Sequence, residues 1–386
     1  MKLAARMEGI HPFHVMELMK RAQALEAAGR DIVHMEVGEP DFPTPQPIID
    51  AAQRFLAAGH VHYTAALGIP ALREAIAGFY ASRYGVAIDP ARIVVTAGAS
   101  AALTLALGAL TTPGDEWLLP DPGYPCNRHI VRFCEGVARP LRVEATTNFQ
   151  PTATAVAAAW TARTRGLVVA SPANPTGTLI DPAELAAIWQ YVRAQGGALI
   201  VDEIYHGLVY GGNAPTALAL NDDIIVINSF SKYFGMTGWR LGWLAAPDDL
   251  VPAIERLAQN LYIAPSTIAQ YAALAAFTPE TLAICEARRE EFRSRRDLLL
   301  PALRRLGFRI ATEPAGAFYI YADIGGLETD SQRLALRLLN DAGIAATPGL
   351  DFGVNAPERH MRFAYTTSAA RLAVGIERIE RFFSKK

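Results

Sequence analysis

The sequence has little cysteine, little net charge and no long apolar run. Its 386 residues include three cysteines, Cys126, Cys134 and Cys285, without CxxC spacing. That sparse, odd set favours a reducing compartment, so we expect a cytoplasmic protein. The net charge of −2 argues against nucleic-acid and acidic-membrane partners. The run 101–110 is too short to span a bilayer, and the first residues lack the apolar core of a secretory signal.

The histidines do not form a recognised metal-binding motif. His11, His14, His60 and His62 are close in sequence, but none falls in an HExxH or similar spacing. We therefore interpret them as isolated side chains and expect no metal.

The remaining composition is that of a large globular protein. Hydrophobic residues make up 51% and charged residues 19%, and the length predicts two or three domains. Between 46 and 280, helical stretches separate apolar, β-rich runs, several of them apolar throughout. Such runs are typical of strands buried on both faces of a largely parallel sheet, which predicts an α/β domain. The expected strands are 92–96, 116–120, 166–171, 198–203, 223–229 and 240–246.

A long, charged helix is expected at 286–307. Its arginine run raises the alternative of an RNA contact, but interleaved glutamates favour a solvated helix that links two domains. A helix near 331–342 and a terminal helix then indicate a smaller α/β domain. We predict an N-terminal arm with part of the small domain (1–45), a large cofactor-binding domain (46–284) and a small C-terminal domain (285–386).

Polar residues follow the expected strands where ligands bind in open α/β sheets, outside the carboxyl ends of the strands. The turn TAGASAAL lets the backbone approach a ligand at Gly98 and opens a helix, whose N-terminus favours phosphate; an ordinary strand-to-helix turn reads the same way. SPANPTG carries Asn174, which also fits a plain turn. Asp202 follows LIV, where an unpaired charge is costly, so a cationic ligand would stabilise it.

The stretch 229–243, SFSKYFGMTGWRLGW, places one lysine and one arginine in an otherwise apolar segment. Burial and a nearby cation both lower a lysine pKa from about 10.4, which frees the amine to attack carbonyls. Arg240 is a candidate for that cation and for a bidentate phosphate contact, and Ser229 for a further phosphate donor. With Asp202 facing a pyridinium nitrogen, this set describes a site for pyridoxal 5′-phosphate.

These motifs together resemble one known family. VGEPDFPTP, HYTAALGIPALREAI, VTAGASAAL, PDPGYP, SPANPTGT, VDEIY, SFSKYFGMTGWRLGW, PAGAFYIY and MRFAY occur in its order over nearly the whole chain. The sequence is identified as similar to the fold-type I, class I/II pyridoxal-phosphate aminotransferases, in the aspartate-aminotransferase-like branch. The resemblance implies a large domain with a mainly parallel, seven-stranded mixed sheet flanked by helices, plus a smaller α/β domain. It also implies a ping-pong exchange of an amino group between an L-amino acid and a 2-oxo acid.

The resemblance further implies a role for each candidate residue. Lys232 looks like the Schiff-base lysine and proton carrier, and Arg362 like the arginine that binds the substrate α-carboxylate. Gly38 is similar to a glycine whose backbone closes on that carboxylate. The resemblance also implies a homodimer, with Tyr63 reaching the phosphate of the neighbouring subunit. The other cofactor contacts it implies are Asp202 at the ring nitrogen, Asn174 and Tyr205 at the phenolic oxygen, Tyr124 on the ring, and Gly98, Ala99, Ser100, Ser229 and Arg240 around the phosphate; Asn174 is also expected near the substrate.

One position departs from the family pattern. Many aspartate-specific members have a lysine where this chain has Ser100, and the only nearby candidate replacement is Arg128 in GYPCNRH. A small neutral or an aromatic amino acid is therefore as good a candidate substrate as aspartate.

Three other functions remain open from the sequence. A pyridoxal-phosphate C–S lyase would use the same lysine, aspartate and arginines. A cofactor-binding regulatory protein would usually carry a helix-turn-helix module, for which only about 45 residues precede the large domain. A dinucleotide-binding enzyme would need GxGxxG after its first strand, and AGASAAL does not fit.

Overall fold

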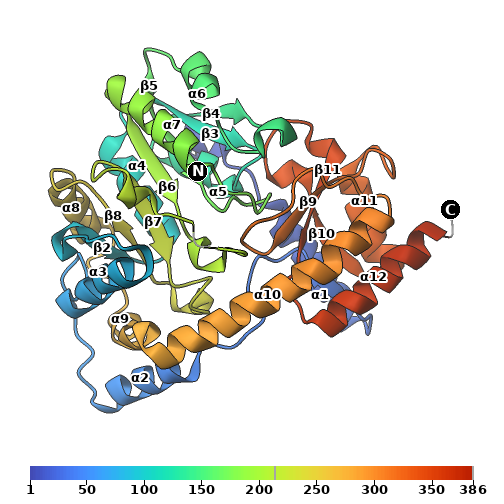
Figure 1. Cartoon of the computed structure of the whole chain (residues 1–386), viewed down its shortest axis with the longest axis horizontal. Coiled ribbons are helices and arrows are strands. Elements are labelled where there is room, and N and C mark those ends of the chain that lie inside the picture. The colour runs from blue at the N-terminus through green and yellow to red at the C-terminus, as the bar shows by residue number, and fades with distance from the viewer. Residues whose placement is uncertain (213, 385–386) are drawn as a thin grey trace.

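The computed structural model describes residues 1–212 and 214–384, which form a large and a small sheet surrounded by helices (Figure 1). The large sheet has seven strands in the order β2-β8-β7-β6-β5-β3-β4. Strand β8 runs antiparallel to both of its neighbours, and the other pairs are parallel. The predicted mixed, mainly parallel sheet is confirmed. Its strands are β2 (Ile93–Thr96), β3 (Glu116–Asp121), β4 (Val137–Arg142), β5 (Thr164–Ala170), β6 (Ala198–Asp202), β7 (Ile225–Ser229) and β8 (Gly242–Ala245).

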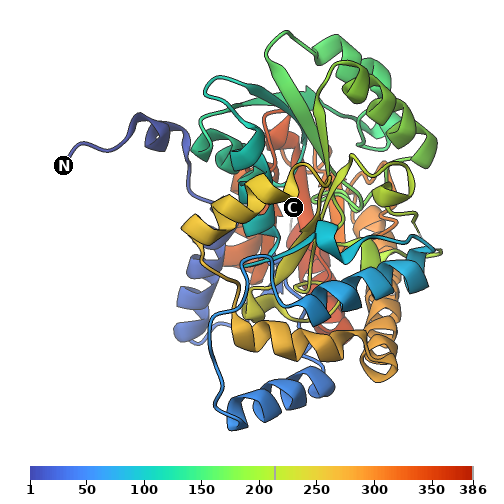
Figure 2. The ribbon, with the colours of Figure 1, turned by 90° about the vertical axis from the view of Figure 1, so that its left-hand side faces the viewer.

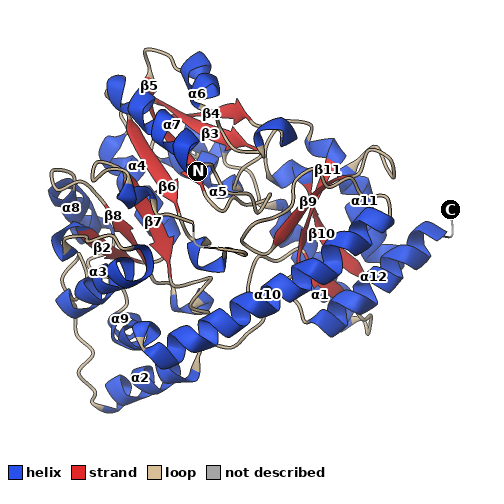
Figure 3. Ribbon diagram, in the orientation of Figure 1, coloured by secondary structure: helices blue, strands red, loops and turns tan. Residues whose placement is uncertain are grey.

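The central strands are apolar throughout because helices cover both faces of the sheet (Figure 3). In β6, Leu199 and Val201 belong to one hydrophobic cluster and Ile200 to the other, and all three are buried. The first cluster includes side chains of α3 (Pro70–Tyr84), α6 (Ala153–Ala159), α7 (Pro182–Ala194) and α9 (Thr267–Ala273). The second includes side chains of α4 (Ala99–Leu110), α5 (Pro125–Phe133) and α8 (Val251–Leu261). Helix α2 (Gln46–Ala57) packs against α9.

Sequence reasoning did not predict β4, which lies at the edge of the large sheet. Its sequence, VARPLR, contains Pro140, and Leu141 is its one buried residue. Proline is tolerated on edge strands because an outward-facing position needs no ladder N–H. Because β4 is largely unburied, its sequence has no continuous apolar run, and the hydrophobic pattern therefore did not indicate a strand there.

The small sheet joins the N-terminal segment to the C-terminal part of the chain. Its order is β1-β10-β11-β9, with β1 parallel to β10 and the other pairs antiparallel. The N-terminal residues thus complete the small sheet; the limits given above for the domains stay a prediction. The elements are β1 (Val33–Met35), β9 (Tyr319–Asp323), β10 (Ile344–Pro348) and β11 (His360–Ala364), with α1 (His14–Ala27), α11 (Ser331–Arg337) and α12 (Ala369–Ser384).

Helix α10 (Pro279–Arg305) runs past both sheets (Figure 1). It begins seven residues before the predicted start at 286. Thr278 caps its N-terminus, because the Thr278 side chain accepts a hydrogen bond from Thr281 N. The helix expected at 331–342 is α11 followed by a π-helical turn, Leu338–Ala342.

Figure 2 shows the N-terminal residues extending away from the two sheets. Ala5–Gly9 forms a short 3₁₀ helix that contains no buried residue. Among the described helices, none combines the length and the apolar character needed to cross a membrane.

Candidate active site

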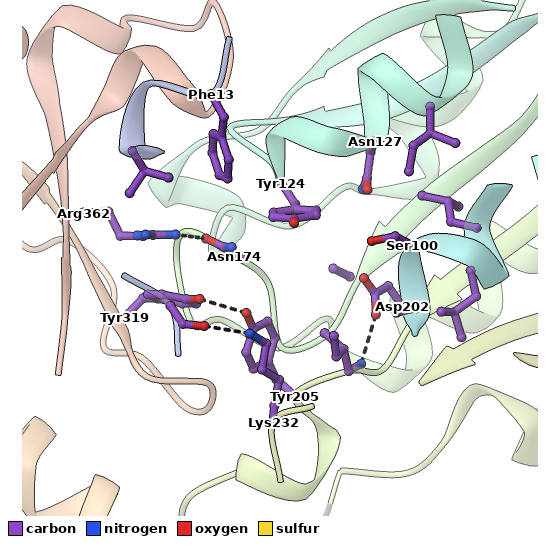
Figure 4. A pocket seen from close by; sticks show the side chains of 18 of the residues that line it. Phe13, Ser100, Tyr124, Asn127, Asn174, Asp202, Tyr205, Lys232, Tyr319 and Arg362 are labelled. Carbon is purple, nitrogen blue, oxygen red and sulfur yellow. Dashed lines mark hydrogen bonds between the residues drawn. The ribbon is translucent and has the colours of Figure 1, made fainter. Parts of the chain in front are cut away.

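A cavity of about 190 Å³ lies at the carboxyl ends of the large-sheet strands, next to the small sheet (Figure 4). Polar residues after β2, β3, β5 and β6 reach it, as the strand-end argument predicted. Of the predicted site residues, those that line it are Gly38, Ala99, Ser100, Tyr124, Asn174, Asp202, Tyr205, Lys232 and Arg362. Gly98, Ser229, Arg240 and Tyr63 are not among its lining residues.

The Lys232 side chain lines this cavity. Its Nζ donates a hydrogen bond to the backbone oxygen of Gly38, at 2.7 Å. Burial lowers the pKa of Lys232 to about 8; Glu39 opposes this shift, while Arg362 and Arg240 add to it. A larger fraction of the amine is therefore neutral near physiological pH than in an exposed lysine.

Gly38 lies where two parts of the chain meet closely. A Cβ at this position would fall 1.9 Å from the Tyr319 hydroxyl oxygen, so a larger residue would push the backbone away. Glycine thus allows the Gly38 carbonyl to reach the lysine.

Asp202 faces the cavity from the end of β6. Its Oδ1 accepts a hydrogen bond from Ile204 N, at 3.0 Å. Burial raises the pKa of Asp202 to about 6, and neighbouring Glu203 adds to the rise, against the N–H of Ile204 and the charge of Lys232. A cationic group beside it would reverse that rise, and this chemistry fits a pyridinium nitrogen.

Arg362 is a buried cation, with 3% of its surface exposed. Its Nη1 donates to Asn174 Oδ1 at 2.9 Å, and its Nη2 donates to the backbone oxygen of Glu36. The guanidinium lies over the Tyr319 ring, 4.3 Å from the centroid. Within the described ranges, Nε has no hydrogen-bond partner and no carboxylate forms an ion pair with this arginine. A buried guanidinium with a free donor is suited to an incoming carboxylate.

Arg240 and the start of α4 form a second place for an anion. Gly98 precedes the helix with φ +82°, and a Cβ there would lie 2.8 Å from Arg240 Nη2. The first turn of α4 has no acidic residue and no side-chain cap. No ion pair joins Arg240 to an acid in the described part of the chain. A guanidinium beside a positive helix end fits a phosphate.

Ser229 and Tyr63, which the resemblance also places at the site, do not line the cavity. Ser229 is buried, and its hydroxyl lies within hydrogen-bond distance of Ser231 Oγ and of the backbone oxygen of Leu241. Tyr63 is 83% exposed and lies away from the cavity of its own chain. Arg128 does not line the cavity either, and its Nη2 donates to the backbone oxygen of Asp351 at 2.9 Å.

Sequence reasoning missed part of the lining. Tyr319, whose hydroxyl lies 2.8 Å from that of Tyr205, belongs to the motif PAGAFYIY, but the motif alone does not show which of its aromatic side chains reaches the cavity. The residue before α1 and the helix itself contribute an apolar wall that the sequence did not indicate, because an amphipathic pattern does not show what the apolar face of a helix contacts. The residues of this wall, called the α1 wall below, are Phe13, Val15, Met16 and Met19.

The fold and the cavity fit a cofactor-dependent enzyme: a buried lysine lies at the cavity, and two arginines without an acidic partner in the described residues lie at or near it. The chain belongs to the class I and II aminotransferase family, whose model matches residues 30–379. This family depends on pyridoxal phosphate, and the protein is an aminotransferase that uses this cofactor.

Two curated relatives illustrate the range of the family. The chain is 40% identical to the valine–pyruvate aminotransferase of Mycobacterium tuberculosis, over 96% of each chain. It is 35% identical to the aspartate aminotransferase of Geobacillus stearothermophilus, over the full length of both. Both relatives are named aminotransferases, which favours this activity over the lyase and regulatory alternatives.

Solved structures give the same result for the fold. A crystal structure of an aminotransferase from Mycobacterium tuberculosis has a TM-score of 0.96 and 39% identity, with both chains covered in full. The Thermus thermophilus aspartate aminotransferase with maleate has a TM-score of 0.94 and 36% identity, over 99% of each chain.

The Lys232 environment predicts how cofactor capture depends on pH. The neutral amine is the nucleophile, so the rate of covalent attachment of pyridoxal phosphate to the cofactor-free protein should rise with pH, with a midpoint near 8. Replacing Arg362 by Met removes a charge that lowers the Lys232 pKa, so the midpoint should move upward. Stopped-flow absorbance measures both midpoints. A wild-type midpoint above 10, as in a solvated lysine, would contradict the described environment.

Proposed function

We propose that this enzyme exchanges amino groups between a neutral, apolar L-amino acid and a 2-oxo acid. One observation carries the proposal: among the described residues that line the cavity, Lys232 and Arg362 are the only basic ones. One of them is needed for the cofactor and the other for the α-carboxylate, so a second substrate carboxylate would find no further cation among the described lining residues of this chain. The α1 wall, with Leu103 and Ile130, is apolar. The name of the valine–pyruvate relative supports the same substrate class.

The donor set supports one arrangement of the cofactor. Asp202 would pair with the ring nitrogen, Tyr124 would lie against the ring, and Asn174 and Tyr205 would donate to the phenolic oxygen. The start of α4 (Gly98, Ala99 and Ser100), Arg240 and Ser229 would hold the phosphate. Lys232 would form the covalent link. When bound, pyridoxal phosphate supplies a ring that withdraws electrons from the substrate Cα.

The chain's own residues would then orient the substrate and move one proton. Arg362 would bind the α-carboxylate through its fork, with Asn174 and Glu36 O fixing the plane of the guanidinium. The Gly38 backbone would close on the same carboxylate. The Lys232 amine, once free, would take the proton from Cα and deliver it to the cofactor side. A pKa near 8 suits an amine that must both accept and release a proton.

A homodimer in which Tyr63 reaches the partner's phosphate site is part of the proposal. Large apolar side chains are exposed near Tyr63, and Thr267 Oγ1 binds the backbone oxygen of His62 at 2.7 Å, which places 61–63 beside the start of α9. Exposed apolar groups gathered in one region are typical of an interface. They include Val61, Tyr63, Leu261, Tyr262 and Ile263. We also propose a cytoplasmic location, which the three free cysteines support.

The substrate proposal is tested by comparing amino donors with pyruvate as acceptor. We expect kcat/KM for valine to exceed that for aspartate by about tenfold or more, the effect of one missing charge pair. In Ser100→Lys, a new cation at the cavity should reduce that ratio by about tenfold, and Ser100→Thr serves as the neutral control. A wild-type preference for aspartate would overturn the proposal.

The role of Arg362 is tested by removing its charge. Arg362→Ala should lower kcat/KM about 100-fold or more for every amino acid, because each carries the α-carboxylate. Isobutylamine, which is valine without that carboxylate, should be affected far less. Arg359→Ala, on the exposed surface of the small sheet, is the matched control. A loss confined to one amino acid would show that Arg362 does not bind the common group.

The dimer is tested by mass and by complementation. Light scattering should give twice the chain mass of 41.7 kDa. Tyr63→Ala and Lys232→Ala should each be inactive or severely impaired alone. An equimolar mixture of the two, after subunit exchange, should regain about a quarter of the wild-type activity, because about half of the molecules are mixed dimers and one of the two sites in each is intact. An active monomer, or mixtures without any recovery, would argue against a shared site.

A further inference from the structure

Asp351 lies at a buried junction between α1 and the small sheet, with 1% of its surface exposed. Its two carboxylate oxygens accept hydrogen bonds from His14 N and Val15 N, each at 2.8 Å. The residue at the N-cap position of α1 is Phe13, whose side chain cannot cap. The first turn of α1 therefore obtains its cap from a residue more than 330 positions away in sequence.

The capped end of α1 is also the end that reaches the substrate cavity. The α1 wall begins at Phe13, immediately before the two capped residues, and continues to Met19. Figure 4 shows Phe13 beside Tyr124, and the two rings meet edge to face with centroids 6.5 Å apart. The position of the first turn of α1 thus sets the position of the wall.

The segment that carries Asp351 is itself held from two sides. Arg128 on α5 donates from Nη2 to the backbone oxygen of Asp351, at 2.9 Å. Gly123 N donates to the backbone oxygen of Phe352, at 2.8 Å, and the Phe352 ring lies 5.0 Å from the Arg362 guanidinium carbon. Asp351 is therefore fixed relative both to the large sheet and to the arginine proposed to bind the α-carboxylate.

We propose that Asp351 is a positioning residue for substrate selection, which holds the α1 wall against the side chain of a bulky, neutral amino donor. The proposal rests on the proposed function and adds the residue that sets the specificity. A side chain such as that of valine reaches an apolar wall, whereas the methyl group of alanine gains little from it. Packing differences of one or two methyl groups change kcat/KM by about 10- to 200-fold.

The test compares Asp351→Ala with Asp181→Ala. Asp181 caps α7 through Ala183 N and Glu184 N, and none of the described α7 residues lines the cavity. In Asp351→Ala, kcat/KM for valine should fall about tenfold or more, mainly through KM, while the value for alanine changes less than about threefold. In Asp181→Ala the ratio of the two values should stay as in the wild type.

A second measurement follows the cap itself. Hydrogen exchange of peptides that cover α1 should be about tenfold faster in Asp351→Ala, because removal of a cap frees the first turn. Exchange in α1 should be unchanged in Asp181→Ala. Asp351→Asn keeps one acceptor oxygen, so both its exchange rates and its valine-to-alanine ratio should lie between those of the wild type and Asp351→Ala. This milder variant also carries the test if the alanine variant does not fold.

The outcomes separate this proposal from the proposed function. Equal losses for valine and alanine, an unchanged ratio, or unchanged exchange in α1 would overturn the role of Asp351. A wild-type enzyme that transfers no amino group from neutral amino acids would instead overturn the proposed function, whatever the exchange rates show.

Discussion

The cost of burying a positive charge shapes this active site. Arg362 and Lys232 enter one largely apolar cavity, and the described residues offer Arg362 neutral oxygens rather than a carboxylate. An internal carboxylate would satisfy the arginine and remove it from use. Its partners, the Asn174 side chain, the Glu36 carbonyl and the Thr347 hydroxyl, fix its orientation and leave Nε without a partner. Burial similarly keeps the Lys232 pKa near 8, so the amine retains reactivity that an exposed lysine lacks.

The residues proposed for chemistry and those proposed for selection come from different parts of the chain. Asp202 ends strand β6, and Asn174 and Lys232 follow strands β5 and β7 of the large sheet, whose buried core fixes their positions. The α1 wall comes from the N-terminal segment and depends on a cap from the C-terminal part of the chain. Such a division allows the substrate to change, through α1, without disturbing the residues proposed to hold the cofactor.

The sequence indicated the strand-end residues of the cavity better than its α1 wall, for physical reasons. Strands buried on both faces produce apolar runs, so β6 and β7 and the polar residues at their ends were recognisable. Edge strand β4 produces no such run. Asp351 caps the helix that follows Phe13, and no local pattern encodes a pairing across most of the chain. The surroundings of Ser229, buried among its own hydrogen bonds, likewise became visible only with the fold.

The most direct test of the central claim is a half-reaction followed by visible absorbance. The purified protein, loaded with pyridoxal phosphate, is mixed with a single amino acid in the absence of any 2-oxo acid. We expect a visible band that valine bleaches stoichiometrically, that pyruvate restores, and that aspartate bleaches far more slowly. A band that no neutral amino acid bleaches would contradict it.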